Sequence, residues 1–191
     1  LDGALTSENR GGFKHNYQSL RVVDRLEQKY EFPGLNLTAA AREGILKHTR
    51  LKRNHYRYPD IDFSRLHFEA DAATTVEGQI VAIADEVAQR THDLEDGMRA
   101  GLVEIDEVRS LEVVKTVEHH LTLARFLATR PDLYVLRSIN GLIEFLVTDI
   151  IEETLRRLAH LVHDGELPEV FDTEVVAFSD RSDSLQKALN K

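Results

Sequence analysis

The chain has 191 residues, of which 42% are hydrophobic and 30% charged, and its formal net charge is −9. This composition is typical of one globular domain, or of one domain with a helical extension, and is too apolar for a disordered chain. There is no cysteine, which excludes disulfides and thiolate metal ligands, so a metal site must use His, Asp and Glu. The sequence has no stripe of basic residues, so nucleic acid is not expected as the main ligand. It also has no stretch of apolar residues long enough for a membrane span, and no secretory signal at its start. We therefore expect a cytoplasmic protein.

The first residue is Leu1, and the only methionine is Met98. Because translation starts at methionine, we expect a fragment, a processed chain or the ordered part of something longer.

Apolar residues in the first third of the chain recur at helical spacing. They predict a helix over residues 15–30, which Pro33 ends. Thr38 predicts the N-cap of a second helix over 39–47, because its hydroxyl can accept a hydrogen bond from the first turn. The segment 50–66 is rich in Tyr, His, Arg and Asp without a clear period, so we expect a long surface loop there.

The rest of the chain predicts longer helices. Helical spacing runs over 76–99, a further helix is expected over 106–128, and a long amphipathic helix over 133–162. A short helix is expected near Ser182. The apolar face of the long helix is predicted to carry Leu136, Ile139, Ile143, Leu146, Ile150, Leu155 and Leu158. No strand-like alternation and no internal repeat competes with this pattern, so we expect an all-α fold.

Three polar residues of the helix over 76–99 are candidates for chemistry. Asp85, Gln89 and Asp93 are four residues apart and therefore share one side of the helix. Eight residues place Asp85 and Asp93 about 12 Å apart along the axis, which suits the two ends of one nucleotide. Acidic residues at this spacing are also typical of a solvated face.

Asp85 lies in the most apolar turn of this helix, the segment 81–88. We therefore expect its carboxylate on or near the buried face, where it needs a partner. A metal ion is one such partner, and a buried salt bridge to Arg21 or Arg25 is the other.

Several histidines have both a structural and a functional interpretation. His48, at a predicted helix end, is interpreted as a partner of the helix dipole or as a ligand contact. The loop residues 55–58 are interpreted as surface residues or as contacts to a base or phosphates. His92 lines a pocket or orients its neighbour Asp93, and the dipeptide His163-Asp164 is interpreted as a charge pair at a helix end.

Five segments of the first half of the chain carry a resemblance. They are GFKHNYQSLRVV (12–23), FPGLNLT (32–38), EGILKH (43–48), QIVAIADE (79–86) and HDLEDGMRAGL (92–102). In this order they resemble the deoxynucleoside triphosphate triphosphohydrolases (dGTPase-like proteins) of the HD-domain phosphohydrolase superfamily. The resemblance covers roughly residues 11–102 and is looser from Asp106 onward.

The resemblance implies an HD-domain-like helical bundle with long amphipathic helices. Residues 1–102 would be the central and C-terminal part of the catalytic domain, and 103–191 a helical extension. The implied activity cuts a deoxynucleoside triphosphate between the 5′-oxygen and the α-phosphorus, which releases deoxynucleoside and triphosphate. It also implies a homo-oligomer and a divalent metal, for which the residue types favour Mg, Mn, Fe, Co or Ni.

Four residues match positions with roles in this family. Asp85 matches the last metal ligand, and His15 matches a catalytic histidine near the α-phosphate. Asp93 matches an aspartate that binds the sugar 3′-hydroxyl. Gln89 stands where the family usually has a tyrosine that packs on the deoxyribose, which puts the sugar selectivity in doubt.

The family's other metal ligands, a histidine and a His-Asp pair, would lie upstream of Leu1. We therefore expect this chain alone to be inactive, because part of the metal site is absent. His119-His120 is not followed by an aspartate, and His163-Asp164 follows Asp85 instead of preceding it. Two alternatives to an enzyme therefore stay open. One is a catalytically incomplete nucleotide-binding or regulatory module, and the other is a plain helical assembly domain, which the helix over 133–162 would suit.

Overall fold

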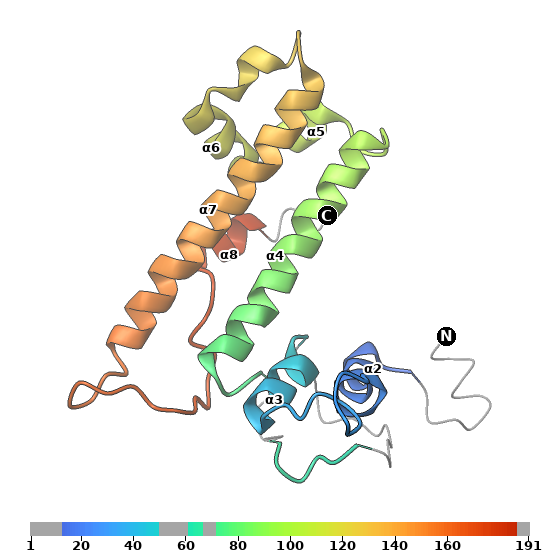
Figure 1. Ribbon diagram of the computed structural model, residues 1–191. Helices are drawn as coiled ribbons and strands as arrows, with labels where there is room; N and C mark the ends of the chain where they lie inside the picture. The colour runs from blue at the N-terminus through green and yellow to red at the C-terminus, as the bar shows by residue number, and fades with distance from the viewer. Residues whose placement is uncertain (1–12, 50–60, 67–71, 187–191) are drawn as a thin grey trace. The chain divides into compact units, whose positions relative to one another are not determined.

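The computed structural model describes residues 13–49, 61–66 and 72–186 (Figure 1). All regular elements within these ranges are helices, which confirms the predicted all-α class. None of the helices in this part of the chain is both long and apolar enough to cross a membrane. In chain order the elements are α2 (His15–Arg21), η1 (Val22–Leu26), α3 (Ala39–Lys47), α4 (Val76–Arg99), α5 (Ile105–Arg109), α6 (Glu112–Leu121), η2 (Leu123–Phe126), α7 (Pro131–Ala159) and α8 (Asp180–Gln186).

The chain divides into two compact units, which are described separately. Unit 1 holds the described residues of Leu1–Ile83 with Glu166–Val175, and unit 2 those of Ala84–Gly165 with Val176–Lys191. The division falls inside α4, which is continuous across it. The domains expected from the sequence, 1–102 and 103–191, refer to family architecture and remain a prediction.

Unit 1 is built on the pairing of α2 with α3. Its apolar core consists of Tyr17, Leu20, Leu46, Ile61 and Leu66. The helix α3 has the predicted bounds, and its first turn is capped as predicted, because Ala41 N donates to the Thr38 hydroxyl at 3.3 Å.

The helix predicted over 15–30 is shorter than expected. After α2 the chain makes one π-helical turn, η1, and then folds back on itself. Leu35 N donates to Val23 O at 2.7 Å and Gly34 N donates to Glu27 O at 2.9 Å, so these carbonyls are taken by the returning chain. Gly34 has φ +76°, and a Cβ there would lie 2.2 Å from Asp24 O. This tight return is possible only because position 34 is glycine.

A buried polar network joins α3 to the start of α4. Glu43 and Lys47 are 3% and 1% exposed, and Lys47 Nζ lies 3.1 Å from Glu43 Oε1. Glu43 also accepts from the amide (3.0 Å) and the hydroxyl (2.9 Å) of Thr74. Burial raises the pKa of Glu43, but the bonds from Thr74 and Lys47 outweigh it and leave the pKa below its ordinary value.

Gln79, in the first turns of α4, holds the returning segment of unit 1. Its side-chain amide donates to Thr173 O at 3.1 Å and to Ala73 O at 2.9 Å. Its carbonyl oxygen accepts from Val175 N at 2.7 Å. One buried side chain therefore satisfies three backbone groups, two of which lie about 95 residues away from it in sequence.

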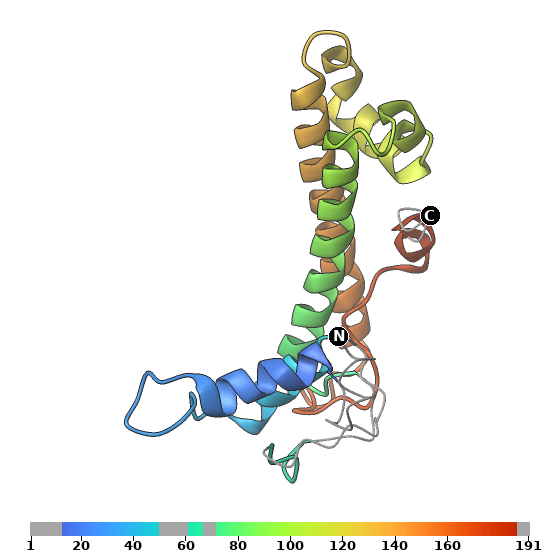
Figure 2. The ribbon, with the colours of Figure 1, turned by 90° about the vertical axis from the view of Figure 1, so that its right-hand side faces the viewer.

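In unit 2, α7 and the unit's part of α4 run alongside one another in both views (Figures 1 and 2). α4 has the predicted bounds, and α8 lies where a short helix was predicted. The core of the unit consists of Met98, Val108, Val113, Val114, Val117, Leu123, Tyr134, Val135, Ile139 and Leu142.

Two helix predictions in unit 2 were wrong in detail. The helix predicted over 106–128 is three short elements, because the chain turns after Arg109 and adopts a left-handed conformation at Thr122 (φ 53°). The helix predicted over 133–162 begins at Pro131, which is favourable at a first helical position, and ends at Ala159. Its predicted apolar face was partly wrong, because Leu136 and Leu155 are 42% and 62% exposed.

Candidate functional site

The candidate substrate-binding face is one side of α4. Asp85, Gln89 and Asp93 are all exposed and follow one another at four-residue spacing. The buried side of the same helix carries Val87 and Thr91. Because successive residues turn by about 100°, a position two residues from Val87 lies on the opposite side of the helix. The three candidates therefore form one solvent-facing row.

The expected burial of Asp85 was wrong. The apolar run 81–88 wraps around the helix instead of marking one face: Val87 is 5% exposed, whereas Val81 is 54% exposed. The alternative, a salt bridge to Arg21 or Arg25, would join Asp85 to residues of the other unit and stays a prediction. The carboxylate remains available to a ligand.

A metal site needs several ligands, and Asp85 supplies one. Within the described ranges, no group of three or more His, Asp or Glu side chains is close enough to hold a metal ion. Divalent ions of the predicted kinds take four or more protein and water ligands. The residues that the structure describes therefore do not by themselves fit a resident metal, although Asp85 has the right chemistry for one ligand.

His15 lies in unit 1, at the first residue of α2, and its side chain is exposed. Its ring faces that of His48, the C-cap of α3, with centroids 5.2 Å apart and planes tilted by 60°. The structure thus brings together two imidazoles that are 33 positions apart in sequence, and this pairing was not predicted. The only sequence signal was the occurrence of both residues in family-like segments.

The neighbour of His15 fixes this arrangement. Asn16 is fully buried and donates through Nδ2 to Leu46 O at 2.8 Å and to the Thr49 hydroxyl at 3.0 Å. These bonds hold the start of α2 against the end of α3. A buried amide that is satisfied in this way costs little and specifies one packing arrangement.

The orientation of His48 follows from its backbone contact. Its Nδ1 lies 2.7 Å from Ile45 O. Because a carbonyl oxygen can only accept, Nδ1 carries a proton, and Nε2 is left for other partners. Two imidazoles held in this way can accept or donate protons and can contact an anion.

The other histidines give no comparable cluster within the described residues. His92 is exposed beside Asp93, and His163 and Asp164 are exposed in the turn after α7, where Asp164 has φ 53°. The loop residues 55–58 lie outside the described residues.

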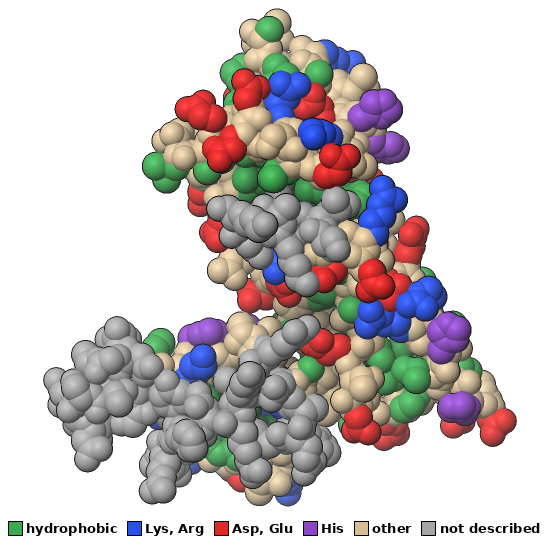
Figure 3. Space-filling model, turned by 180° about the vertical axis from the view of Figure 1, so that it is seen from behind, with side chains coloured by type: hydrophobic (Ala, Val, Ile, Leu, Met, Phe, Trp, Pro, Cys, Tyr) green, Lys and Arg blue, Asp and Glu red, His purple; other side chains and the backbone are tan. Residues whose placement is uncertain are grey.

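On the face drawn in Figure 3, Lys and Arg side chains of the described residues are interleaved with Asp and Glu.

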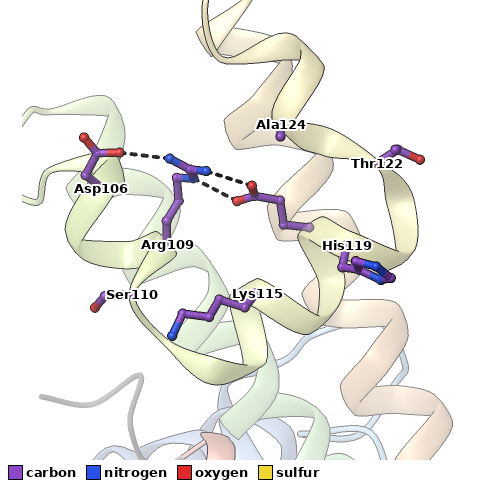
Figure 4. Close-up of a pocket in the computed structure, with 8 residues that line it drawn as sticks. Asp106, Arg109, Ser110, Lys115, His119, Thr122 and Ala124 are labelled. Atoms are coloured by element: carbon purple, nitrogen blue, oxygen red, sulfur yellow. Dashed lines mark hydrogen bonds and ion pairs between the residues drawn. The ribbon is translucent and has the colours of Figure 1, made fainter.

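A cavity of about 610 Å³ in unit 2 contains none of the predicted site residues. Figure 4 shows its main cation, Arg109, held between Asp106 and Glu118. Both guanidinium bonds to Glu118 measure 2.9 Å, and the Tyr134 hydroxyl donates to the same carboxylate at 2.9 Å. Burial and this bond raise the pKa of Tyr134 to about 12. The charges in this cavity already satisfy one another, so we interpret it as structural.

The chain is similar to curated proteins over most of its length. It is 37% identical to a "Deoxyguanosinetriphosphate triphosphohydrolase-like protein" of Brucella ovis over 96% of this chain, and 38% identical to one of Brucella anthropi over 95%. A protein of the same description from Nitrobacter hamburgensis is 35% identical over 83% of this chain. Over the length that it covers, the chain belongs to this dGTPase-like family.

The match is partial on the side of the relatives. The chain spans about half the length of the curated relatives it matches, 48% for the two Brucella proteins and 42% for the Nitrobacter protein. No protein-family model matches it. The predicted family is confirmed, and the helical structure agrees with the fold expected for a dGTPase-like fragment.

Proposed function

We propose that this chain is part of a hydrolase that splits deoxynucleoside triphosphates, of the dGTP kind, into deoxynucleoside and triphosphate. The observation that carries the proposal is the exposed row of Asp85, Gln89 and Asp93 on a helix that belongs to a dGTPase-like sequence. The row is about 12 Å long at 1.5 Å per residue, which suits the two ends of one nucleotide.

Each residue of the row has a role that its chemistry supports. Asp93 accepts a hydrogen bond from the sugar 3′-hydroxyl, and its charge disfavours a phosphate at that position. Gln89 packs beside the sugar with a smaller, more polar surface than an aromatic ring would offer. Asp85 is one ligand of a divalent ion near the phosphates. A bound ion would polarise the phosphoryl group, and its further ligands must come from outside the described residues.

We assign His15 and His48 to the phosphates of the substrate. Protonated, the His15 imidazole stabilises charge on the α-phosphate or protonates the departing 5′-oxygen. The His48 ring lies beside it with its Nε2 available, so it is a second contact for a phosphate oxygen. Two protonated imidazoles would offer local positive charge to a polyanion in a chain whose net charge is −9.

The test is a product assay with a matched pair of variants. The complete hydrolase is incubated with Mn²⁺ and each deoxynucleoside triphosphate, and triphosphate, pyrophosphate and phosphate are separated by ion exchange. The chain by itself should release none of them, because it supplies one metal ligand within the described residues. We expect triphosphate release that falls in Asp93→Asn and is unchanged in Glu95→Gln, since Glu95 also belongs to α4 but is two residues from Asp93 and therefore lies on another side of the helix. Release of pyrophosphate instead would contradict the reaction class.

The second candidate is a nucleotide-binding module without catalysis. It is favoured by the absence of a three-ligand metal group within the described residues. It predicts saturable binding of a deoxynucleotide that Asp93→Asn weakens, with no product formed. Equal binding by Asp93→Asn and the unaltered chain would contradict both candidates.

We also propose that the protein acts as a homo-oligomer in the cytoplasm. One side of α7 leaves Val147, Ile151 and Leu155 between 42% and 62% exposed, at helical spacing. Such an apolar row is costly in water and is typical of a surface that meets a partner helix. Light scattering should show a smaller particle after Ile151→Glu, and an unchanged mass would count against this surface.

A further inference from the structure

A second pocket lies in unit 1, at the other end of the α2–α3 pair from His15 and His48. The start of α2 meets the end of α3 at the two histidines, whereas the η1 turn meets the start of α3 at this pocket. Its volume is about 640 Å³, within the range of small-ligand sites. It is lined by Asp24, Arg25, Phe32, Pro33, Asn36, Leu37, Ala39, Arg42, Asp62 and Arg65.

Three guanidinium groups from three different segments meet in this pocket. Arg25 belongs to η1, Arg42 to α3 and Arg65 to the segment 61–66. Two carboxylates accompany them, so the lining carries an excess of positive charge in a chain whose net charge is −9. Arginine is the side chain best suited to grip phosphate oxygens, because its planar fork offers parallel donors.

The two acids of the pocket are already engaged. Asp24 accepts both the Nε (2.8 Å) and the Nη2 (2.7 Å) of Arg42. Asp62 accepts from the amide of Ser64 at 2.9 Å, which lowers the pKa of Asp62. Each carboxylate therefore has a structural partner. The Arg65 guanidinium is exposed, and its attraction to Asp62 is electrostatic only, since no hydrogen bond or close ion pair joins it to another described residue.

Specific bonds hold the walls of the pocket in place. Arg42 ties α3 both to η1, through Asp24, and to the 61–66 segment, since its Nη2 donates to Asp62 O at 2.7 Å. The return at Gly34 holds the loop that carries Phe32 against η1. A cation held by bonds to neighbouring segments is preorganised for a ligand and loses little entropy on binding.

Another part of the lining is apolar and aromatic. Phe32 is 47% exposed and stacks on Tyr30, with ring centroids 5.2 Å apart and planes 20° apart. Pro33 and Leu37 extend this wall. Exposed, stacked aromatic rings beside cationic groups are the combination that binds a nucleobase together with its phosphate.

We propose that this pocket binds a nucleotide, with its phosphate on Arg65 and its base against Phe32. The site shares no residue with the row on α4 or with the His15–His48 pair, and it does not depend on the proposed hydrolysis. An inorganic anion alone would use the guanidiniums and leave the aromatic wall empty. A nucleotide fills both halves of the cavity.

The test uses calorimetry on the full 191-residue chain with adenosine 5′-monophosphate, which has no triphosphate to lose. Pyrophosphate and adenosine probe the two halves of the pocket separately. Arg65→Ala should weaken the binding of adenosine monophosphate and of pyrophosphate by about tenfold or more. Phe32→Ala should weaken the binding of adenosine monophosphate by roughly tenfold, as expected for one lost stacking contact, and should leave the binding of pyrophosphate unchanged.

Two control variants show whether a loss of affinity belongs to this pocket. Arg125→Ala removes an exposed guanidinium in unit 2 and should leave the affinity for adenosine monophosphate unchanged. Lys115→Ala removes a cation that lines the structural cavity of unit 2 and should also leave it unchanged. Arg42 is avoided because its loss would release two segments. The proposal is overturned if adenosine monophosphate fails to saturate at millimolar concentration, or if Arg65→Ala and Phe32→Ala bind it as well as the unaltered chain.

Discussion

The substitution Glu43→Gln should strongly destabilise unit 1. Glu43 and Lys47 are at most 3% exposed, and the carboxylate accepts three hydrogen bonds from Lys47 and Thr74. Glutamine keeps an acceptor for Thr74 but leaves the Lys47 ammonium buried without its counter-charge. Removing one partner of a buried pair costs about 3–5 kcal/mol, so we expect a loss of about 3 kcal/mol.

A matched pair elsewhere gives the control. Glu95 and Arg99 are also four residues apart, but Arg99 is 52% exposed. Because exposed pairs contribute little, Glu95→Gln should cost less than about 0.5 kcal/mol. The double variant Glu43→Gln with Lys47→Met should recover most of the loss, since it removes the unpaired charge.

Urea unfolding followed by far-UV circular dichroism measures these changes. The chain has two compact units, so hydrogen exchange of peptides from α3 and α7 is used to assign each transition to one of them. The folded pKa of Glu43 lies below its unfolded value of 4.5, so its contribution is present above that pH and is lost as the pH falls. The decrease in the free energy of unfolding that Glu43 causes at acid pH should be missing in Glu43→Gln. A loss below about 1 kcal/mol at pH 7, the range of an exposed pair, would show that the buried charge of Lys47 does not need Glu43.

Two glycine substitutions test the backbone and the packing. Gly34→Ala should cost at least about 3 kcal/mol, because the new Cβ would meet the backbone of Asp24, whereas Gly101→Ala, with φ +66° and open space around it, should cost only about 1 kcal/mol. Equal costs in thermal unfolding would contradict the role given to the return at Gly34. Gly141→Ala should cost about 2 kcal/mol, since its Cβ would lie 2.5 Å from Cγ1 of the buried, β-branched Val117 and 2.6 Å from Leu121 Cδ1, and the gain in helix propensity offsets only part of this strain. A stabilised Gly141→Ala protein would show that α6 and α7 pack less closely than these distances require.

The sequence predicted the helices whose signals are local. The bounds of α3 follow from the Thr38 cap and from the point where apolar residues stop recurring at helical spacing. In α4 this spacing continues without a break until Gly101 ends it. The helix predicted over 106–128 was wrong because the left-handed residue that ends α6 is Thr122, where composition gives no glycine signal.

The buried faces were harder to predict than the helices. Near Asp85, apolar residues occur on every side of the helix. The spacing of apolar residues therefore did not show that Val87 faces inward and Asp85 outward. The pairing of His15 with His48, and the meeting of three arginines beside Phe32, depend on how α2 packs against α3. Such long-range contacts leave no mark in the local spacing of residues.

The exposure of the α4 row limits how tightly it can hold a nucleotide in this chain. A hydrogen bond from a sugar hydroxyl to the exposed Asp93 competes with water and is worth about 0.5–1.5 kcal/mol. Asp93→Asn should therefore weaken deoxynucleotide binding to the chain by no more than about tenfold in titration calorimetry. The same carboxylate in an enclosed, dry site would be worth far more, because the interaction strengthens as water is excluded. A hundredfold loss would show that another part of the protein covers this face, and would overturn the view that the row on α4 is open to solvent.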